Sequence, residues 1–128
     1  MRIHHIGYLV KHIEAARERF EELGYNLKTD VVKDKERGVL ICFIEKDGYL
    51  IELVSPAGEG SSVKSLIKRY GNTPYHICYQ ADDFDRDLSE LEAGGFLRID
   101  SPSPAPAIEG RKVCFLQNSQ IGMVELLM

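Results

Sequence analysis

The second half of this 128-residue chain repeats the first, and the repeat limits the folds open to it more than any other feature. The matching segments lie 71 residues apart near the start of the chain and 72 or 73 apart toward its end. The matches are 5–8 with 76–79, 24–25 with 95–96, 41–44 with 113–116 and 50–53 with 123–126. A repeat of this length predicts two copies of one supersecondary unit.

Each copy combines strand-like and helical patterns. In the first copy, β-branched and aromatic residues mark the strands, and apolar residues at helical spacing run from Ile13 to a terminating glycine at Gly24. The Asp47-Gly48 pair predicts a hairpin turn between the last two strands. Strands are expected at 3–10, 27–32, 39–44 and 49–54.

The second copy has the same order, with strands expected at 75–81, 96–99, 112–116 and 123–127 and a helix at 84–93. The proline-rich segment 101–106 is expected to be an extended loop, because proline fixes φ and removes backbone donors. We therefore predict one α+β domain of two tandem βαβββ modules. Module 1 covers about 1–57, a linker helix about 58–73 and module 2 about 74–128.

Composition excludes several classes of protein. Sixteen Lys and Arg against twenty Asp and Glu give a net charge of −4, so there is no basic surplus for a nucleic-acid partner. No apolar run approaches the roughly 18 residues of a membrane span. The N-terminus lacks the apolar core and cleavage site of a signal peptide, so we expect a cytoplasmic protein without a membrane partner.

The three cysteines are expected to be small buried hydrophobic residues. Cys42, Cys78 and Cys114 are an odd number, lie far apart and have no CxxC spacing. Each stands within an apolar strand-like run. They therefore predict reduced core thiols, not a disulfide framework or a zinc site.

Two carboxylates stand in apolar strands at equivalent positions of the repeat. Glu52 lies within LIELV and Glu125 within MVELL, where a carboxylate is costly unless it is paired, hydrogen-bonded or metal-bound. His5 and His76 are also equivalent. One such residue alone is usually a satisfied core or edge residue. Two matched pairs, however, form a common set of ligands for a divalent cation.

Strand alternation separates these residues from the other histidines. Glu52 and Glu125 share a face with apolar neighbours, which suits a partly apolar pocket better than open solvent. His4 is expected on the opposite face, has Tyr75 as its counterpart, and is interpreted as structural. His12, at the start of the first helix, is interpreted as a surface residue.

These patterns resemble the vicinal oxygen chelate superfamily, which includes glyoxalase I, methylmalonyl-CoA epimerase, fosfomycin and bleomycin resistance proteins and extradiol dioxygenases. The likeness covers essentially the whole chain and is strongest to the epimerase branch. Residues 4–7 resemble its opening HHIG or DHIG, 51–56 its IELLxP, 75–78 its HHIC and 124–127 its closing IELL. The resemblance implies a glyoxalase-like fold: a curved eight-stranded mixed sheet with helices outside and a metal site inside, in a homodimer.

The resemblance also implies the site residues. The metal ligands would be His5, Glu52, His76 and Glu125, holding a divalent ion such as Co, Ni, Zn or Mn. The epimerases carry a proton-transferring glutamate in an EQG sequence, which Glu36-Arg37-Gly38 matches with Arg in place of Gln. The chain departs from the epimerase pattern at Tyr75 and in the Ser-Pro loop at 101–106. Both departures concern the substrate and not the metal.

The implied chemistry is proton transfer at a carbon next to a carbonyl, because a metal stabilises the oxyanion that forms. An epimerase acting on a thioester would use Glu36 and Glu125 as its two bases. A lactoylglutathione lyase, acting on a glutathione hemithioacetal, would use the ligands Glu52 and Glu125. Five basic side chains are either receptors for an anionic carrier such as coenzyme A or ordinary surface charges, namely Lys64, Lys68, Arg69, Arg111 and Lys112.

Two further alternatives stay open. A ligand-sequestering module like the bleomycin resistance proteins keeps this fold without a full ligand set, and the four matched residues count against it. Extradiol dioxygenases and fosfomycin-modifying transferases use two His and one Glu. Glu52 as a fourth ligand would occupy a position that those reactions need open.

Overall fold

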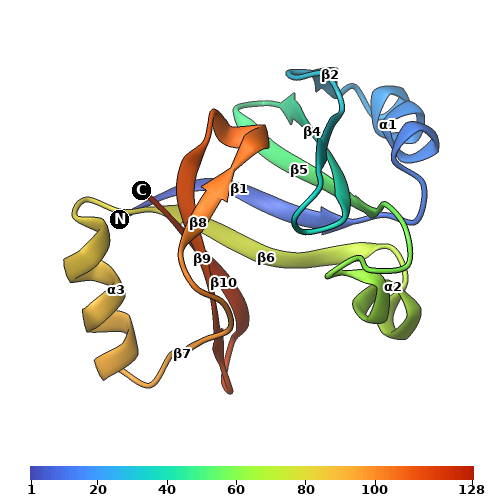
Figure 1. Cartoon of the computed structure of the whole chain (residues 1–128). Coiled ribbons are helices and arrows are strands. Elements are labelled where there is room, and N and C mark those ends of the chain that lie inside the picture. The colour runs from blue at the N-terminus through green and yellow to red at the C-terminus, as the bar shows by residue number, and fades with distance from the viewer. The chain divides into compact units, whose positions relative to one another are not determined.

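The computed structural model describes all of residues 1–128, with ten strands, three α-helices and one 3₁₀ turn (Figure 1). The chain forms two compact units. The N-terminal unit is Ile6–Tyr75, and the C-terminal unit combines Met1–His5 with His76–Met128. None of the helices has the length and apolar character that crossing a membrane would require.

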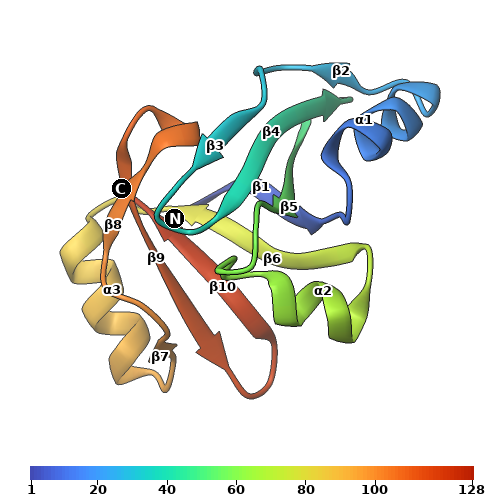
Figure 2. The same cartoon turned by 45° about the vertical axis from the view of Figure 1, so that its right-hand side comes forward.

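The N-terminal unit contains the first copy of the repeat. The elements of this copy are β1 (Arg2–Leu9), whose residues up to His5 belong to the C-terminal unit, α1 (Ile13–Glu22), β2 (Asn26–Leu27), β3 (Val32–Asp34), β4 (Val39–Lys46), β5 (Tyr49–Pro56) and α2 (Lys64–Tyr70). β1 runs parallel to β5, β5 pairs antiparallel with β4, and β2 and β3 both pair with β4 (Figure 2). At the β4–β5 hairpin, Asp47 and Gly48 have φ of 53° and 83°, which confirms the predicted tight turn.

The second copy of the repeat has the same order of strands and long helix, without a counterpart of α2. It contains β6 (Thr73–Gln80), α3 (Phe84–Ala93), β7 (Leu97–Arg98), β8 (Ser103–Ala105), the 3₁₀ turn η1 (Pro106–Ile108), β9 (Arg111–Asn118) and β10 (Gly122–Leu127). β6 runs parallel to β10, β10 pairs antiparallel with β9, and β7 and β8 both pair with β9. The predicted α+β class with two related modules is confirmed, although ten strands replace the expected eight.

One additional strand occurs in each copy, between the long helix and the long strand β4 or β9. The predicted strand 27–32 is divided into β2 and β3, because the side chain of Thr29 accepts the Phe43 N–H that a backbone carbonyl would otherwise bond. At the equivalent place, Asp100 Oδ1 accepts the Phe115 N–H, and β7 ends at Arg98. The prediction of an extended loop at 101–106 is wrong in part, because 103–105 pair with β9 as β8 and η1 begins at Pro106. A side-chain acceptor thus interrupts the ladder in both copies.

Each unit packs its long helix against one face of its own strands. In the N-terminal unit, Ile13 and Phe20 of α1 pack with Ile51 and Leu53 of β5. In the C-terminal unit, the helix residues Phe84 and Leu88 of α3 pack with strand residues that include Cys114, Leu116, Val124 and Leu126. Because strand side chains alternate, Glu52 and Glu125 project from the opposite face in each unit, away from the helix. Both are nevertheless buried.

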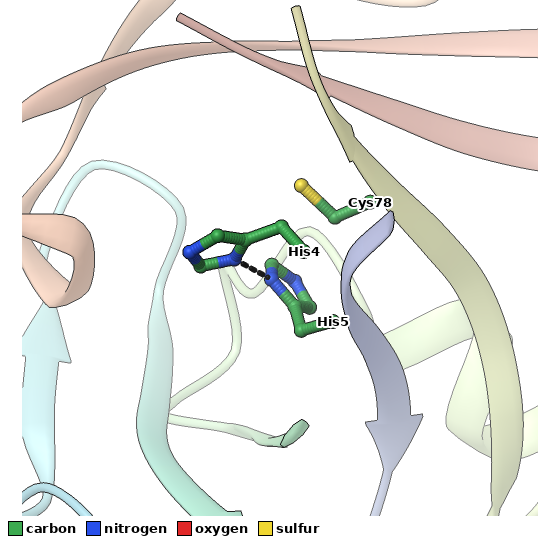
Figure 3. Close-up of side chains that lie close together, drawn as sticks. All are labelled: His4, His5 and Cys78. Carbon is green, nitrogen blue, oxygen red and sulfur yellow. Dashed lines mark hydrogen bonds between the residues drawn. The ribbon is translucent and has the colours of Figure 1, made fainter. Parts of the chain in front are cut away.

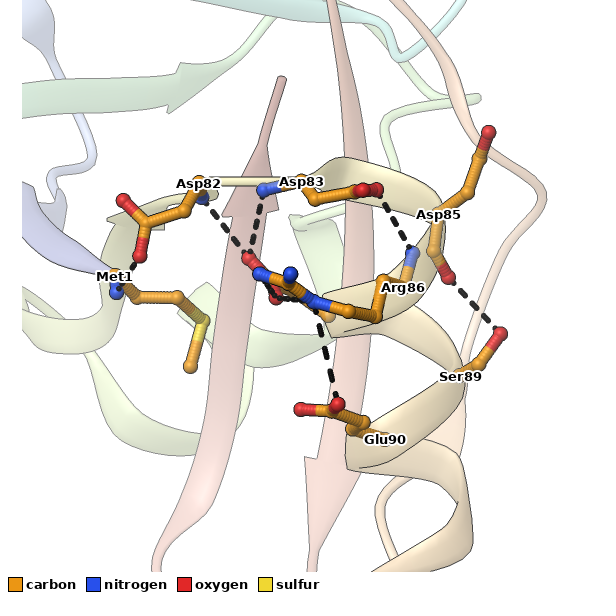
Figure 4. Close-up of polar contacts among 8 residues, drawn as sticks. Met1, Asp82, Asp83, Asp85, Arg86, Ser89 and Glu90 are labelled. Carbon is orange, nitrogen blue, oxygen red and sulfur yellow. Dashed lines mark hydrogen bonds and ion pairs between the residues drawn. The ribbon is translucent and has the colours of Figure 1, made fainter.

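A group of carboxylates begins α3 (Figure 4). Asp83 is the N-cap residue, and its Oδ1 accepts the Arg86 N–H at 3.1 Å. The buried Asp87 side chain accepts the N–H groups of Asp82 and Asp83 at 2.9 and 3.1 Å. Its bonds from the backbone and from Arg86 hold the pKa of the Asp87 carboxyl below its ordinary value. These bonds fix the chain before α3 and satisfy the Arg86 N–H in its first turn.

The cysteine prediction is confirmed. Cys42, Cys78 and Cys114 are all buried and reduced. Desolvation by burial raises the pKa of both the Cys42 and the Cys114 thiols to about 11. These residues behave as core hydrophobic side chains.

Candidate metal centre

Three of the four predicted ligands come together in the C-terminal unit. Glu125 Oε2 lies 3.2 Å from His5 Nε2 and 3.1 Å from His76 Nε2, and the two imidazole nitrogens are 3.3 Å apart. All three side chains are buried, with His5 only 1 % exposed. Two imidazole nitrogens and one carboxylate oxygen therefore converge in an enclosed space.

Strand register places His76 and Glu125 together. β6 and β10 run parallel, and Glu125 lies opposite Cys78. His76 stands two residues before Cys78, so alternation puts it on the same face as Glu125. From the next strand, Phe115 lies opposite Glu125, and its ring meets the His76 ring edge-to-face at a centroid distance of 5.1 Å. Phe115 thus gives the group an apolar wall.

The electrostatics of Glu125 suit a cation. Burial by itself would raise the pKa of the Glu125 carboxyl, but the contacts with His5 and His76 outweigh it, so the pKa lies well below its ordinary value. The buried Oε2 atom makes no hydrogen bond of good geometry despite its short distances to the imidazoles. Three electron-pair donors facing one another in this way fit a divalent ion with mixed nitrogen and oxygen ligands.

Glu52, the fourth predicted ligand, belongs to the N-terminal unit. It lies on β5 with 4 % exposure, opposite Gly7 on one side and Phe43 on the other. Cys78 and Phe115, the neighbours of Glu125, are the repeat equivalents of Gly7 and Phe43. Glu52 therefore has the same register in its own unit as Glu125 has in the other.

Glu36, the predicted base, has a different environment. It is exposed in the turn between β3 and β4. Its neighbour Arg37 bonds the buried Asp34 carboxylate at 2.6 Å, and the Arg37 carbonyl accepts the Ser62 N–H at 2.9 Å. The turn that carries Glu36 is thus fixed by its neighbours, while its carboxylate faces solvent.

The two remaining histidines have different surroundings. His12 is exposed at the N-cap of α1, as expected for a surface residue. His4 was placed on the opposite face of its strand, yet its Nδ1 lies 2.9 Å from His5 Nδ1. Alternation fixes the direction of the Cα–Cβ bond only, and the His4 ring turns back toward His5 (Figure 3). Sequence reasoning also missed Phe115, although its position opposite Glu125 is repeated by Phe43 opposite Glu52.

Three of the five basic side chains considered as carrier receptors have local partners. Lys64 pairs with Glu59, the Arg69 guanidinium lies 5.2 Å from the Tyr70 ring centroid, and Arg111 donates to the Met128 carbonyl. Lys64 and Arg69 are both exposed. These contacts are typical of surface charges.

Sequence comparison relates the chain to a family and to several epimerases. Residues 4–115 match the family model described as the Glyoxalase/Bleomycin resistance protein/Dioxygenase superfamily. An ethylmalonyl-CoA/methylmalonyl-CoA epimerase of Cereibacter sphaeroides is 29 % identical over 117 residues, which cover 90 % of this chain and 87 % of the relative. The mitochondrial methylmalonyl-CoA epimerase of Bos taurus is 26 % identical over 98 % of this chain and 73 % of its own length.

Solved structures share the fold. A hypothetical protein from Bacillus halodurans C-125 superimposes with a TM-score of 0.87 at 25 % identity, covering 98 % of this chain and 92 % of that one. A variant of Streptomyces coelicolor methylmalonyl-CoA epimerase, in complex with 2-nitronate-propionyl-CoA, gives a TM-score of 0.84 at 23 % identity, covering 99 % and 96 %. The methylmalonyl-CoA epimerase of Mycobacterium tuberculosis gives 0.85 at 18 % identity, covering 98 % and 86 %.

Proposed function

Because the chain belongs to the Glyoxalase/Bleomycin resistance/Dioxygenase superfamily, we propose that it is a metal-dependent epimerase that moves a proton next to the carbonyl of a thioester such as methylmalonyl-CoA. The observation that carries the proposal is the buried group of His5, His76 and Glu125. The named epimerase relatives, which align over nearly the whole chain, favour a thioester substrate.

The proposed ligands are His5, His76, Glu125 and, as the fourth, Glu52. Glu52 shares the face of Gly7 on β1, and alternation puts His5, two residues earlier on that strand, on the same face. In the other copy, Glu125 likewise lies opposite the residue two positions after His76, and these two side chains are in contact. When bound, a divalent ion such as Co, Ni, Zn or Mn would supply Lewis-acid stabilisation of the oxyanion that proton removal creates.

Glu125 and Glu36 are the two proposed proton carriers. Glu125 is buried, and the Phe115 ring packs against the His76 ring beside it, so its carboxylate would act as a base in a site largely shielded from solvent. Glu36 would return a proton from the opposite side of that carbon. The fixed turn beneath it, held by Arg37 and Asp34, supports this role by limiting the places its carboxylate can reach.

One observation favours a second candidate, a lactoylglutathione lyase. Glu36 is exposed, whereas Glu52 is buried with the same register as Glu125. Shuttling by Glu52 and Glu125 needs no exposed base. A homodimer is proposed for either enzyme, because exposed strand edges favour pairing between copies. A monomer in sedimentation at micromolar concentration would contradict the dimer but not the enzyme.

The decisive experiment combines metal analysis with proton exchange. The purified protein should carry about one divalent ion per chain, and it should incorporate solvent deuterium into methylmalonyl-CoA. Exchange into the methylglyoxal–glutathione adduct alone would favour the lyase. A chain without metal that exchanges neither substrate would contradict both proposals, and tight binding of a drug-like ligand by such a chain would indicate the sequestering class. His12→Ala is the matched control, because it removes an exposed imidazole outside the centre.

A further inference from the structure

The two ring nitrogens of His5 have different neighbours. Nε2 faces His76 and Glu125, at 3.3 and 3.2 Å. Nδ1 faces His4 Nδ1 at 2.9 Å, which is hydrogen-bond distance (Figure 3). One side of the ring therefore points into the proposed metal centre, and the other side is in contact with a half-buried imidazole.

The positions of the ring protons determine which histidine donates the His4–His5 hydrogen bond. A neutral imidazole that offers the lone pair of Nε2 to a cation carries its proton on Nδ1. In His5 that Nδ1–H group needs an acceptor, because it is buried. The Nδ1 lone pair of His4 is in place to accept it, with the His4 proton on Nε2.

We infer that His4 is a positioning residue, which holds His5 in the tautomer and orientation that direct its Nε2 lone pair at a bound cation. The inference rests on the proposed function, since it presumes the metal centre. His5 is also confined sterically, because its ring meets the His4 ring at 78° and the His76 ring at 75°, with centroids 5.2 and 5.4 Å away. Ring rotation about χ2 would break the bond to His4 and disturb both contacts.

Only the first copy of the repeat has a histidine directly before its ligand histidine. The position equivalent to His4 is Tyr75, whose ring carries no nitrogen beside Cγ. The two histidine ligands, equivalent by sequence, are therefore supported differently. His4, His5 and Cys78 also offer ligand atoms within 4.8 Å of one another, so direct ligation by His4 and Cys78 is the competing explanation that the test must separate.

Two substitutions of nearly equal size isolate the acceptor. Asn Oδ1 and Leu Cδ both branch from Cγ, as His Nδ1 does, but only the Asn atom accepts a hydrogen bond. We expect His4→Leu to weaken Zn²⁺ affinity, measured by competition with a chelator, by about 10- to 100-fold, the usual effect of removing the outer partner of a ligating histidine. His4→Asn should stay close to the unsubstituted protein. His12→Leu is the control for the same chemical change at an exposed histidine.

NMR of the zinc-loaded protein adds a readout independent of activity. The His5 Nδ1–H proton should give a downfield, slowly exchanging signal in the unsubstituted protein and in His4→Asn, and should lose it in His4→Leu. Thermal unfolding of each metal-free variant checks that it folds. A His4→Leu variant too unstable to test would be replaced by His4→Val, which also lacks the acceptor.

Each outcome bears on one proposal. If the unsubstituted protein binds no zinc, the proposed function fails and the inference falls with it. If the unsubstituted protein and His4→Leu bind zinc equally, with the signal retained, the inference alone is overturned. A third outcome is that the unsubstituted protein binds two zinc ions and that His4→Leu and His4→Asn both lose the second ion but keep the first. In that case His4 would be a zinc ligand together with Cys78, and the inference would also be overturned.

Discussion

The two copies of the repeat agree closely in their strands and differ at the start of their helices. Glu52 and Glu125 have the same register against β1 and β6, and a Phe lies opposite each of them. By contrast, the N-cap residue of α3 is Asp83, whose side chain accepts a backbone N–H, whereas the N-cap residue of α1 is His12, whose side chain accepts none. The face that carries the candidate ligands is thus duplicated with precision, while the helix on the other face varies in its local stabilisation.

The largest expected effect tests whether the two strand glutamates are functionally equivalent. Glu125→Gln should lose bound metal and lower turnover by about 10² or more, because one carboxylate serves as ligand and as base. Glu52→Gln should weaken metal binding with a smaller loss of turnover in an epimerase. Metal analysis and deuterium exchange check both variants. Equal losses of turnover with metal retained would indicate shuttling by the two ligands instead.

The next effect concerns a residue that has no duplicated partner. Glu36→Gln should leave metal content unchanged and lower turnover by about 10², the usual scale for removing a general base. Deuterium exchange into methylmalonyl-CoA measures it, with the exposed Glu59→Gln as a control for the loss of one surface carboxylate. Full activity of Glu36→Gln on every thioester tested would contradict the two-base assignment.

A third prediction transfers the cap from one helix to the other. Asp83 and His12 have nearly the same backbone, with φ and ψ of −141° and 104° against −134° and 110°. Asp83→Ala should therefore lower the free energy of unfolding by about 1 kcal/mol, and His12→Asp should raise it by a similar or smaller amount. Urea unfolding measures both. No gain in His12→Asp would mean that something besides the cap separates the two helices.

The smallest expected effect concerns how the stability to urea changes as the pH is lowered. The pKa of Asp87 is lowered in the folded state, so its contribution is complete above the ordinary carboxyl pKa and is lost as the pH falls through the folded value. Asp87→Asn should therefore lower the urea midpoint at neutral pH and leave it less dependent on pH in acid. Ala16, the equivalent position in α1, has no carboxylate, so Ala16→Ser should leave this pH dependence unchanged.

Much of the fold and part of the site could be predicted from the sequence, because they depend on periodicity and repetition. Buried glutamates at matched positions identified Glu52 and Glu125, and the predicted bounds of α3 are those observed. The interruption at Thr29 was beyond such reasoning, since Thr is itself a good strand former and only its hydrogen bond to Phe43 reveals the break. The His4–His5 contact depends on ring torsions that residue order does not encode.

The matched cysteines give each copy its own reporter of local opening. Cys42 lies in the N-terminal unit and Cys114 in the C-terminal unit, and both thiols are fully shielded from solvent. With pKa values of about 11, they are scarcely ionised at neutral pH even apart from their shielding, so an alkylating reagent reaches them only when the surrounding strands separate. Equal labelling rates at these two positions would show that the two copies open together in one cooperative step, and different rates would show that they open separately.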